Sequence, residues 1–306
     1  MSVFLGQGTY GQVWTPPPIL CQNIKDLDKT KKYVGKLSFQ DKDTNLKTAL
    51  DLQQKRKRMD PTARYTIPFI GHCKKKTHAQ KEWQPFPERN IQFVYEYGGK
   101  SWDKWIFKKK KLCFQLLFLS FRDIVHGLEV MNKAGIAHMD IKLPNIVYDL
   151  DTNTSKLIDY DLMILQSEIY DFYYRKHKHY YIIYHAWPPE INFIYNVREQ
   201  LSTIPNYEIT NTYNHLPRYL QLYILNEIRR YSLSNSYREK FVDHQKIDIY
   251  GLGMAFAELF GNVDPDIWNL TQQMIRADPR QRINTLNLIQ KYEILYKKFI
   301  TSRNKN

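Results

Sequence analysis

The chain of 306 residues is 43% hydrophobic and 25% charged, a balance that is ordinary for a folded globular protein. It carries 45 Lys and Arg against 31 Asp and Glu, which gives a formal net charge of +14. Such a charge favours acidic partners, including nucleotides, nucleic acids, anionic lipids and acidic proteins, without choosing among them. No run of about 18 apolar residues occurs, so we expect no membrane span.

The N-terminus and the cysteines predict an intracellular protein that is not secreted. Residues 1–10 contain no basic region followed by an apolar core, so they are unlike a secretory signal. Cys21, Cys73 and Cys113 are far apart and form no C-x-x-C pair. This pattern argues against a zinc site and against a disulfide framework, and it fits a reducing compartment.

Strand patterns dominate the first third of the chain. Residues 2–13 predict two strands joined by a glycine-rich turn, and 15–32, with three consecutive prolines, predict an exposed loop. Residues 31–39 return to strand character, and 46–59 predict a basic surface helix that is stopped by a proline. A further strand is expected over 91–97, ended by two glycines.

Helical patterns dominate the remainder. Residues 112–132, 249–260 and 284–299 repeat apolar side chains at helical spacing. Residues 192–244, rich in Asn, Tyr and Arg, show the weakest organisation. A strand-rich third followed by a helix-rich remainder predicts an α+β protein of two lobes with a cleft between them.

Two features near the N-terminus are suited to phosphate groups. Residues 6–13 fit G-x-G-x-x-G-x-V, in which glycines permit positive φ and let backbone N–H groups approach phosphates. Taken alone, a glycine turn without a ligand is about equally consistent with this motif. Lys36 lies in an apolar strand and would need an anion if buried, although an edge-strand lysine facing solvent is the simpler interpretation in isolation.

The most informative segment is 138–145, His-Met-Asp-Ile-Lys-Leu-Pro-Asn. Phosphoryl transfer needs a carboxylate that accepts the proton of the attacking hydroxyl, a cation near the moving group, and oxygen ligands for Mg²⁺. Asp140, Lys142 and Asn145 offer these groups, and Asp159, 14 residues after Asn145, can bridge metal and phosphate. An Asx-rich turn without a catalytic role is the weaker alternative, because two polar clusters bracket one short apolar strand.

In this order the motifs resemble those of the protein kinases. The glycine loop, the strand lysine and H-x-D-x-K-x-x-N are followed by Asp-Tyr-Asp at 159–161 for D-F-G and Pro-Pro-Glu at 188–190 for A-P-E. Asp248 begins a segment that looks like the helix anchoring the catalytic loop. Arg282 looks like the arginine that pairs with the glutamate of A-P-E, here Glu190.

The resemblance, which covers about residues 4–290, implies a bilobal protein-kinase fold. A small β-rich N-lobe would span about 1–97 and a larger helical C-lobe about 98–300, followed by a short polar tail, 301–306. It implies an enzyme that uses ATP with Mg²⁺ or Mn²⁺ and phosphorylates Ser or Thr of protein substrates, because Lys142 stands two residues after the catalytic aspartate. The implied residues are Asp140 and Lys142 for catalysis; Leu5, Gly6, Gly8, Gly11, Val13, Lys36, Glu96 and Tyr97 for ATP; Asn145 and Asp159 for metal; and Asp51, Glu190, Asp248 and Arg282 for structure or regulation.

One departure from the family pattern concerns the partner of the strand lysine. No glutamate lies between Lys36 and Glu82, so the helix glutamate that should pair with the lysine is missing. Asp51 is the best substitute, and a solvated carboxylate on the helix surface is an equal alternative for it.

Other departures lie in the catalytic and activation segments. Met139 replaces the arginine that other kinases pair with an activation-segment phosphate, and Asp161 replaces a glycine, which should limit backbone freedom. Ile183 stands where threonine is usual. The span from Glu190 to Asp248 is longer than the family needs, so we expect an insertion at 192–244.

Two other classes of function stay open at this point. A pseudokinase would keep the fold and bind nucleotide or partners without phosphotransfer, although such proteins usually lose the metal and base residues that are present here. A basic nucleic-acid-binding protein is suggested by the runs 55–58, 74–76 and 108–111. Such runs are usually solvated faces, and these lack interleaved aromatic residues for base stacking.

Finer resemblances point to an unusual branch of the family. Asp-Tyr-Asp is similar to the triplet of haspin-like kinases, which also lack D-F-G. The composition rich in Tyr, Ile, Asn and Lys, together with 59–61 and 97–99, resembles kinases of large cytoplasmic DNA viruses. This would place the protein in the host cytoplasm or the virion.

Overall fold

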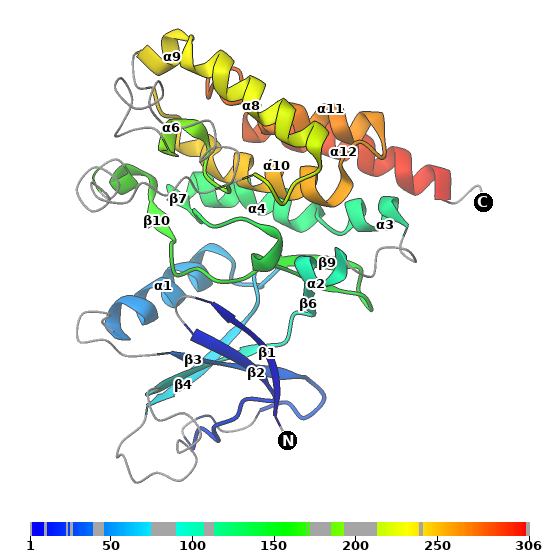
Figure 1. Ribbon diagram of the computed structural model, residues 1–306. Coiled ribbons are helices and arrows are strands. Elements are labelled where there is room, and N and C mark those ends of the chain that lie inside the picture. The colour runs from blue at the N-terminus through cyan, green and yellow to red at the C-terminus, as the bar shows by residue number, and fades with distance from the viewer. Residues whose placement is uncertain are drawn as a thin grey trace. The chain divides into compact units, whose positions relative to one another are not determined.

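The computed structural model describes residues 2–8, 11–22, 24, 27–38, 46–74, 90–106, 113–169, 171, 185–192, 213–238 and 241–303 (Figure 1). It divides into two compact units, Met1–Gly99 and Lys100–Asn306. The first is built on an antiparallel sheet and the second mainly on helices, so the expected α+β class is confirmed. Within the described ranges, no helix is long and apolar enough to cross a membrane.

The first unit contains a five-stranded antiparallel sheet in the order β1-β2-β3-β5-β4. The strands are β1 (Val3–Gly8), β2 (Gly11–Thr15), β3 (Tyr33–Ser38), β4 (Phe69–Lys74) and β5 (Ile91–Glu96). Interior strands supply apolar side chains to the core of this unit, among them Leu37, Ile91 and Val94. The strands predicted within 2–13, 31–39 and 91–97 are confirmed.

Helix α1 (Leu46–Met59) has the predicted bounds, but it is more than a basic surface helix. Arg56 is buried and donates to Gln53 Oε1 at 3.2 Å and to the Ile67 carbonyl at 2.6 Å. Gln53 in turn donates from Nε2 to the Tyr95 hydroxyl on β5 at 3.1 Å. The expected surface helix is therefore attached to the sheet by a polar network, because the donors of a buried guanidinium must find acceptors.

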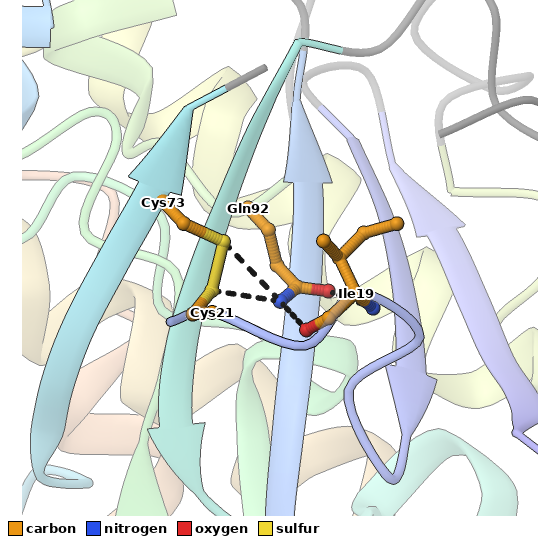
Figure 2. The surroundings of a disulfide bond; sticks show 4 residues. All are labelled: Ile19, Cys21, Cys73 and Gln92. Atoms are coloured by element: carbon orange, nitrogen blue, oxygen red, sulfur yellow. Dashed lines mark hydrogen bonds between the residues drawn. A yellow bond between two sulfur atoms is a disulfide. The ribbon is translucent and has the colours of Figure 1, made fainter. Parts of the chain in front are cut away.

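The proline-rich segment 15–32 is tied to the sheet rather than fully exposed. Ile19 and Cys21 are buried. Gln92 on β5 accepts the Ile19 N–H at 3.0 Å and donates to the Ile19 carbonyl at 2.7 Å (Figure 2). The exposed-loop prediction is therefore wrong at these residues.

Cys21 forms a disulfide with Cys73 on β4, as Figure 2 shows, with 5.4 Å between the Cα atoms. The expectation of no disulfide is wrong. The two cysteines are 52 residues apart, and only the folded loop brings them together. The cysteines therefore no longer indicate a reducing compartment.

The second unit is organised around α10 (Ile247–Phe260), in which every residue except Glu258 is buried. It packs on α11, α11 on α12, and α12 on α3 and α4. The helices predicted over 249–260 and 284–299 are confirmed as α10 and α12. The other bounds are α2 (Trp102–Ile106), α3 (Phe114–Leu119), α4 (Arg122–Lys133), α6 (Pro189–Asn192), α8 (Arg218–Ser232), α9 (Asn235–Arg238), α11 (Pro265–Met274) and α12 (Thr285–Arg303).

Two small sheets in this unit present the loops of interest. One has the strand order β6-β8-β9 and the other pairs β10 with β7. The bounds are β6 (Lys100–Ser101), β7 (Ile136–Ala137), β8 (Ile146–Asp149), β9 (Thr154–Leu157) and β10 (Ile164–Leu165), with 3-10 helices η3 (Leu143–Asn145), η4 (Gln166–Glu168) and η5 (His244–Lys246).

The single helix expected over 112–132 is two helices, α3 and α4, separated at Ser120 and Phe121. The Ser120 carbonyl accepts the N–H of Ser155 on β9 at 2.8 Å, and the hydroxyls of the two serines lie 2.7 Å apart. The backbone at Ser120 is hydrogen-bonded to strand β9, which is distant in sequence, and the helix does not continue through it. A tertiary contact therefore overrides the helical pattern of the sequence.

Part of the span 192–244, expected to be weakly organised, is helical. Leu220, Ile224 and Ile228 of α8 are buried in a cluster with Tyr250 and Met254 of α10. The expectation is wrong for these residues, because an Asn- and Arg-rich composition hides an apolar repeat of helical spacing. Residues 193–212 and 239–240 lie outside the described ranges, and the insertion itself stays a prediction.

Candidate active site

The candidate catalytic loop, 138–145, is held by a carboxylate on α10. Asp248 Oδ2 accepts the His138 N–H at 2.7 Å, and its Oδ1 accepts the Met139 N–H at 2.9 Å. Burial raises the pKa of the Asp248 carboxyl, an effect that His138 and the two backbone donors oppose. Asp248 thus lies where the sequence predicts an anchor for this loop.

Asp140 lies between an amide and an ammonium group. Its Oδ2 accepts from Asn145 Nδ2 at 2.7 Å, and its Oδ1 is 3.0 Å from Lys142 Nζ. The side chains of Asp140 and Lys142 are 10% and 24% exposed, so both reach solvent while in contact with each other. A carboxylate oriented in this way can accept a proton from a hydroxyl.

The backbone next to Asp159 lies beside Asn145. The N–H of Ile158 donates to the Asn145 carbonyl at 2.9 Å, and Asp159 is the next residue along the chain. Both contacts of the Asn145 amide to Asp140 use Nδ2, so Oδ1 is the amide atom left for a cation. A carboxylate and an amide oxygen are ligands that Mg²⁺ and Mn²⁺ accept, so these residues fit the metal that the resemblance implies.

The Asp-Tyr-Asp triplet is accommodated without a glycine. Tyr160 is buried, with its ring 4.8 Å from that of His138 and its hydroxyl donating to the Leu157 carbonyl at 2.9 Å. The left-handed residue is Asp159, with φ 62°, a conformation that aspartate tolerates. Asp161 is not among the described residues with positive φ, so this conformation does not need a glycine there, and the expected limit on backbone freedom stays a prediction.

Met139 fills its position with apolar contacts. Its backbone is left-handed, with φ 66°, which costs about 1–2 kcal/mol in a residue of this kind. Its carbonyl accepts from Trp187 Nε1 at 2.7 Å. The side chain is buried in a cluster with Ala137, Ile169, Ile191 and Ile247. Where the family pattern has a cation, this loop therefore has a packed thioether.

Glu190 on α6 and Arg282 form a bidentate ion pair, with Nη1–Oε1 at 2.6 Å and Nη2–Oε2 at 2.9 Å. Both side chains are fully buried. Arg282 Nε also donates to the Arg276 carbonyl at 2.9 Å. Burial raises the pKa of Glu190, and Arg282 opposes that shift. The structure thus brings together the two residues that the sequence pairs.

In the first unit the glycine motif forms the β1–β2 hairpin. Gly8 pairs with Gly11 at its end, and Leu5 lies at a shift of register in β1. Val13 pairs with Lys36 on β3. Residues 9–10, at the tip, lie outside the described residues.

Gly11 of this hairpin serves close approach rather than positive φ. In the described part of the chain, the positive-φ glycines are Gly99, Gly135 and Gly261, so the predicted reason is wrong for the hairpin. At Gly11 an added Cβ would lie 2.5 Å from the Leu37 carbonyl oxygen on β3. Only a residue without a side chain fits against that strand.

Lys36 is half-buried on β3, which pairs with both β2 and β5. The alternative of an edge-strand lysine is therefore wrong. Asp51 is exposed on α1, as expected of a solvated surface carboxylate, and its proposed pairing with Lys36 stays a prediction.

Glu96 and Tyr97, the residues expected to contact adenine, use their backbone N–H groups within the unit. These groups donate to the carbonyls of Pro68 at 3.1 Å and Lys32 at 2.9 Å. The Glu96 carboxylate also pairs with Lys31 at 2.6 Å. A ligand at this segment would therefore find both N–H groups already paired.

Two contacts of the catalytic loop had no role assigned from the sequence. An added Cβ at Gly251 of α10 would lie 2.8 Å from the Ile141 carbonyl oxygen. A glycine inside a helix is a signal of close approach, so this contact could have been inferred. No sequence signal marks the contact between Trp187 and the Met139 carbonyl. Glu82 and Ile183 lie outside the described residues.

Comparisons with known proteins agree with this geometry. The protein kinase domain family matches residues 2–188, more than half of the chain. A curated relative, the membrane-associated tyrosine- and threonine-specific cdc2-inhibitory kinase of Drosophila melanogaster, is 24% identical over 162 residues. The alignment covers 52% of this chain and 26% of the relative, so the chain spans about a quarter of the relative's length.

Proposed function

The chain belongs to the protein kinase family, and we propose on that basis that it is an active enzyme that transfers the γ-phosphoryl group of ATP to Ser or Thr hydroxyls of proteins. The observation that carries the proposal is the Asp140 carboxylate, fixed 2.7 Å from Asn145 Nδ2 and 3.0 Å from Lys142 Nζ. A protein that only binds nucleotide has no use for a proton acceptor oriented in this way.

Each residue of the loop has a distinct role in this proposal. Asp140 orients the substrate hydroxyl and accepts its proton while the hydroxyl oxygen bonds to the γ-phosphorus and the bond to ADP breaks. Lys142 places a positive charge beside that reaction. Bound Mg²⁺ or Mn²⁺ would neutralise phosphate charge, with Asn145 and Asp159 as its protein ligands.

The first unit would hold the nucleotide. Lys36, on an interior strand, would pair with phosphate oxygens, and the hairpin residues Leu5, Gly6, Gly8, Gly11 and Val13 would cover them. The carbonyls of Glu96 and Tyr97 would accept from the adenine amino group, whereas the N–H groups of both residues already have partners.

The choice of Ser or Thr rests on Lys142, two residues after Asp140, as in the serine/threonine kinases that the motif resembles. The Drosophila relative carries tyrosine and threonine in its name, so tyrosine is the competing acceptor to test.

The test is phosphotransfer from γ-labelled ATP with Mg²⁺ to a generic basic protein and to the chain itself, followed by phosphoamino-acid analysis. Label on serine or threonine supports the proposal. Label on tyrosine alone contradicts the specificity but keeps the enzyme. No label, together with a Mg²⁺-dependent thermal shift by ATP, supports the pseudokinase.

The thermal shift has its own control. Asp159→Ala should remove the Mg²⁺-dependent part of the shift, because the anionic metal ligand is lost. An unchanged shift would place the metal elsewhere and would favour the pseudokinase.

A nucleic-acid-binding function has less support. In the run 55–58, Arg56 is buried in hydrogen bonds to its own unit, so this run is not a continuous basic face. DNA binding that weakens with salt would support this function instead, if the slope of log affinity against log salt concentration corresponds to several phosphate contacts.

Regulation follows from Met139. A buried thioether offers no charge to an activation-segment phosphate, so the enzyme should be active without one. A tenfold or greater fall in rate on phosphatase treatment, about 1.4 kcal/mol on the barrier, would contradict this. The haspin-like and viral resemblances, and a location in the host cytoplasm or virion, stay predictions.

A further inference from the structure

Three side chains of types that can bind metals, from separate segments, meet in the second unit: His185, His215 and Glu258. Their ligand atoms all lie within 4.8 Å of one another. The two imidazole rings are 5.2 Å apart, and His215 Nε2 is 3.9 Å from Glu258 Oε1. Among the residues that the structure describes, no other three His, Cys, Asp or Glu side chains gather in this way.

Two of these residues are held by the core. Glu258 is the one residue of α10 that is not buried, so a rigid central helix presents its carboxylate. His215 lies in a turn between Tyr213 and Leu216, which are both buried in the α8–α10 cluster. The Leu216 N–H donates to the Tyr213 carbonyl at 3.0 Å and closes that turn.

The third residue, His185, belongs to a segment that lies against the catalytic loop. Two residues on, Trp187 donates to the Met139 carbonyl at 2.7 Å. The carbonyl oxygens of Ala186 and of Ile141, in the catalytic loop, both lie against Gly251 of α10. A Cβ added at Gly251 would be 3.3 Å from the first and 2.8 Å from the second. The cluster therefore joins the segment before Glu190 to α10.

Two imidazoles and one carboxylate are a ligand set that zinc takes in proteins, with a water in the fourth position. Bonds of about 2.1 Å in a tetrahedron separate the ligand atoms by about 3.4 Å. The His215–Glu258 distance of 3.9 Å is longer than a direct hydrogen bond and close to that separation. The His215 side chain is 45% exposed, so a change of rotamer can complete the approach.

We propose that His185, His215 and Glu258 bind one Zn²⁺ ion, which ties the segment 185–188 and the turn 213–217 to α10. The ion acts as a cross-link that holds the segment against the catalytic loop. It is separate from the metal proposed for ATP, whose ligands are the oxygens of Asn145 and Asp159, because imidazole favours zinc and oxygen favours magnesium. The site goes beyond the proposed phosphotransfer and does not depend on it.

The test uses the full chain without nucleotide, stripped with a chelator and reloaded with Zn²⁺ or Co²⁺. We expect one metal ion retained per chain and a visible Co²⁺ spectrum of the intense, four-coordinate type. The melting temperature should rise with free Zn²⁺ concentration. Hydrogen exchange should slow in the peptide that covers 185–192.

Matched variants locate the ion. His215→Ala and Glu258→Gln should each lose binding at Zn²⁺ concentrations that saturate the parent, whereas His126→Gln, which removes an imidazole paired with Glu293, should keep it. Both ligand positions are partly exposed, so the variants should fold, and their far-ultraviolet circular dichroism checks this. Equal binding by parent and His215→Ala, or no retained ion in the parent, would overturn the proposal and leave an ordinary ion pair.

Discussion

Asp248 in the second unit and Gln92 in the first perform the same task with different chemistry. Each is buried and holds one loop through two backbone hydrogen bonds. Asp248 accepts the N–H groups of His138 and Met139, whereas Gln92 accepts the N–H of Ile19 and donates to its carbonyl. A carboxylate only accepts, while a primary amide accepts and donates. The backbone groups that a loop presents therefore decide which side chain can hold it.

The difference also concerns strength. Hydrogen bonds to a charged group are stronger than those between neutral groups. The loop held by the charge is the strained one, with a left-handed Met139. The loop held by the neutral amide is also tied by the Cys21–Cys73 disulfide (Figure 2). The charged anchor thus stands where a loop that carries candidate catalytic groups needs a fixed conformation.

Exchanging the amide for a carboxylate in the first unit should have the largest effect on stability. Gln92→Glu would set an ionised oxygen against the Ile19 carbonyl at a site with no exposure, for a loss of about 3–5 kcal/mol at neutral pH. Burial would raise the pKa of the new carboxyl in the folded state. The loss of stability should therefore shrink as the pH falls towards the pKa that this carboxyl has in the unfolded chain, because the protonated form can donate to the Ile19 carbonyl.

Denaturant unfolding of this variant at several pH values measures the effect. Gln12→Glu, on the partly exposed face of β2, is the matched control and should change little. A loss that is equal in the two variants, or that is independent of pH, would contradict the pairing seen at Gln92.

The reverse exchange in the second unit should have a smaller effect. Asp248→Asn retains one acceptor oxygen, so either His138 or Met139 loses its partner, for a loss of about 1–3 kcal/mol. Turnover should fall as well, because the loop 138–145 loses its anchor. Asp266→Asn, at a pair that is half exposed, is the control and should cost less than about 1 kcal/mol. Two equal losses would mean that the anchor is not needed.

A smaller effect on stability is expected where α10 touches the catalytic loop. In Gly251→Ala the new Cβ meets the Ile141 carbonyl at 2.8 Å, and the strain is partly offset by the better helix propensity of alanine, for a net loss of about 1–2 kcal/mol. Turnover should fall on the order of 10- to 100-fold, because the loop is displaced.

The matched control lies two residues along the same helix. In Gly253→Ala the new Cβ meets Ile275 and Met274 at 2.7 Å, away from the loop. It should lose similar stability with turnover nearly unchanged. If the two variants have the same turnover, the contact of Gly251 does not position the loop.

Removing one neutral hydrogen bond near the charged anchor should have the smallest effect. Tyr160→Phe loses the bond to the Leu157 carbonyl and keeps the ring against His138, for a loss of about 0.5–1.5 kcal/mol. Its ATP-dependent turnover should stay within about twofold of the parent, about 0.4 kcal/mol on the barrier. A larger fall would give the hydroxyl a role in positioning Asp159.

The contacts that could be predicted from the sequence are those that join one family motif to another. Asp248 with the loop at 138, and Glu190 with Arg282, were paired before the fold was known, because the resemblance carries a geometry along with the residues. Elements with an apolar repeat at helical spacing, such as α10 and α12, were likewise predicted closely, and α1 was predicted from its polar helix-forming residues and the proline that follows them.

The rest depends on contacts that no local pattern encodes. Gln92, the Cys21–Cys73 pair and the break at Ser120 all result from segments that meet only in the folded chain. The cluster of His185, His215 and Glu258 draws on three segments in the same way, and its histidines stand outside every motif. Helix α8 is a different case, because its apolar repeat was present in the sequence and was hidden by a polar composition.

The most direct test of an active kinase with Asp140 as its base is the initial rate of phosphotransfer by Asp140→Asn. The amide keeps the shape but cannot accept the hydroxyl proton, so the rate should fall about 10²- to 10⁴-fold with ATP affinity and melting temperature nearly unchanged. Asp149→Asn, at the end of β8, should keep the parental rate. A near-parental rate for Asp140→Asn would contradict the account, since the carboxylate between Lys142 and Asn145 would then have no part in the chemistry.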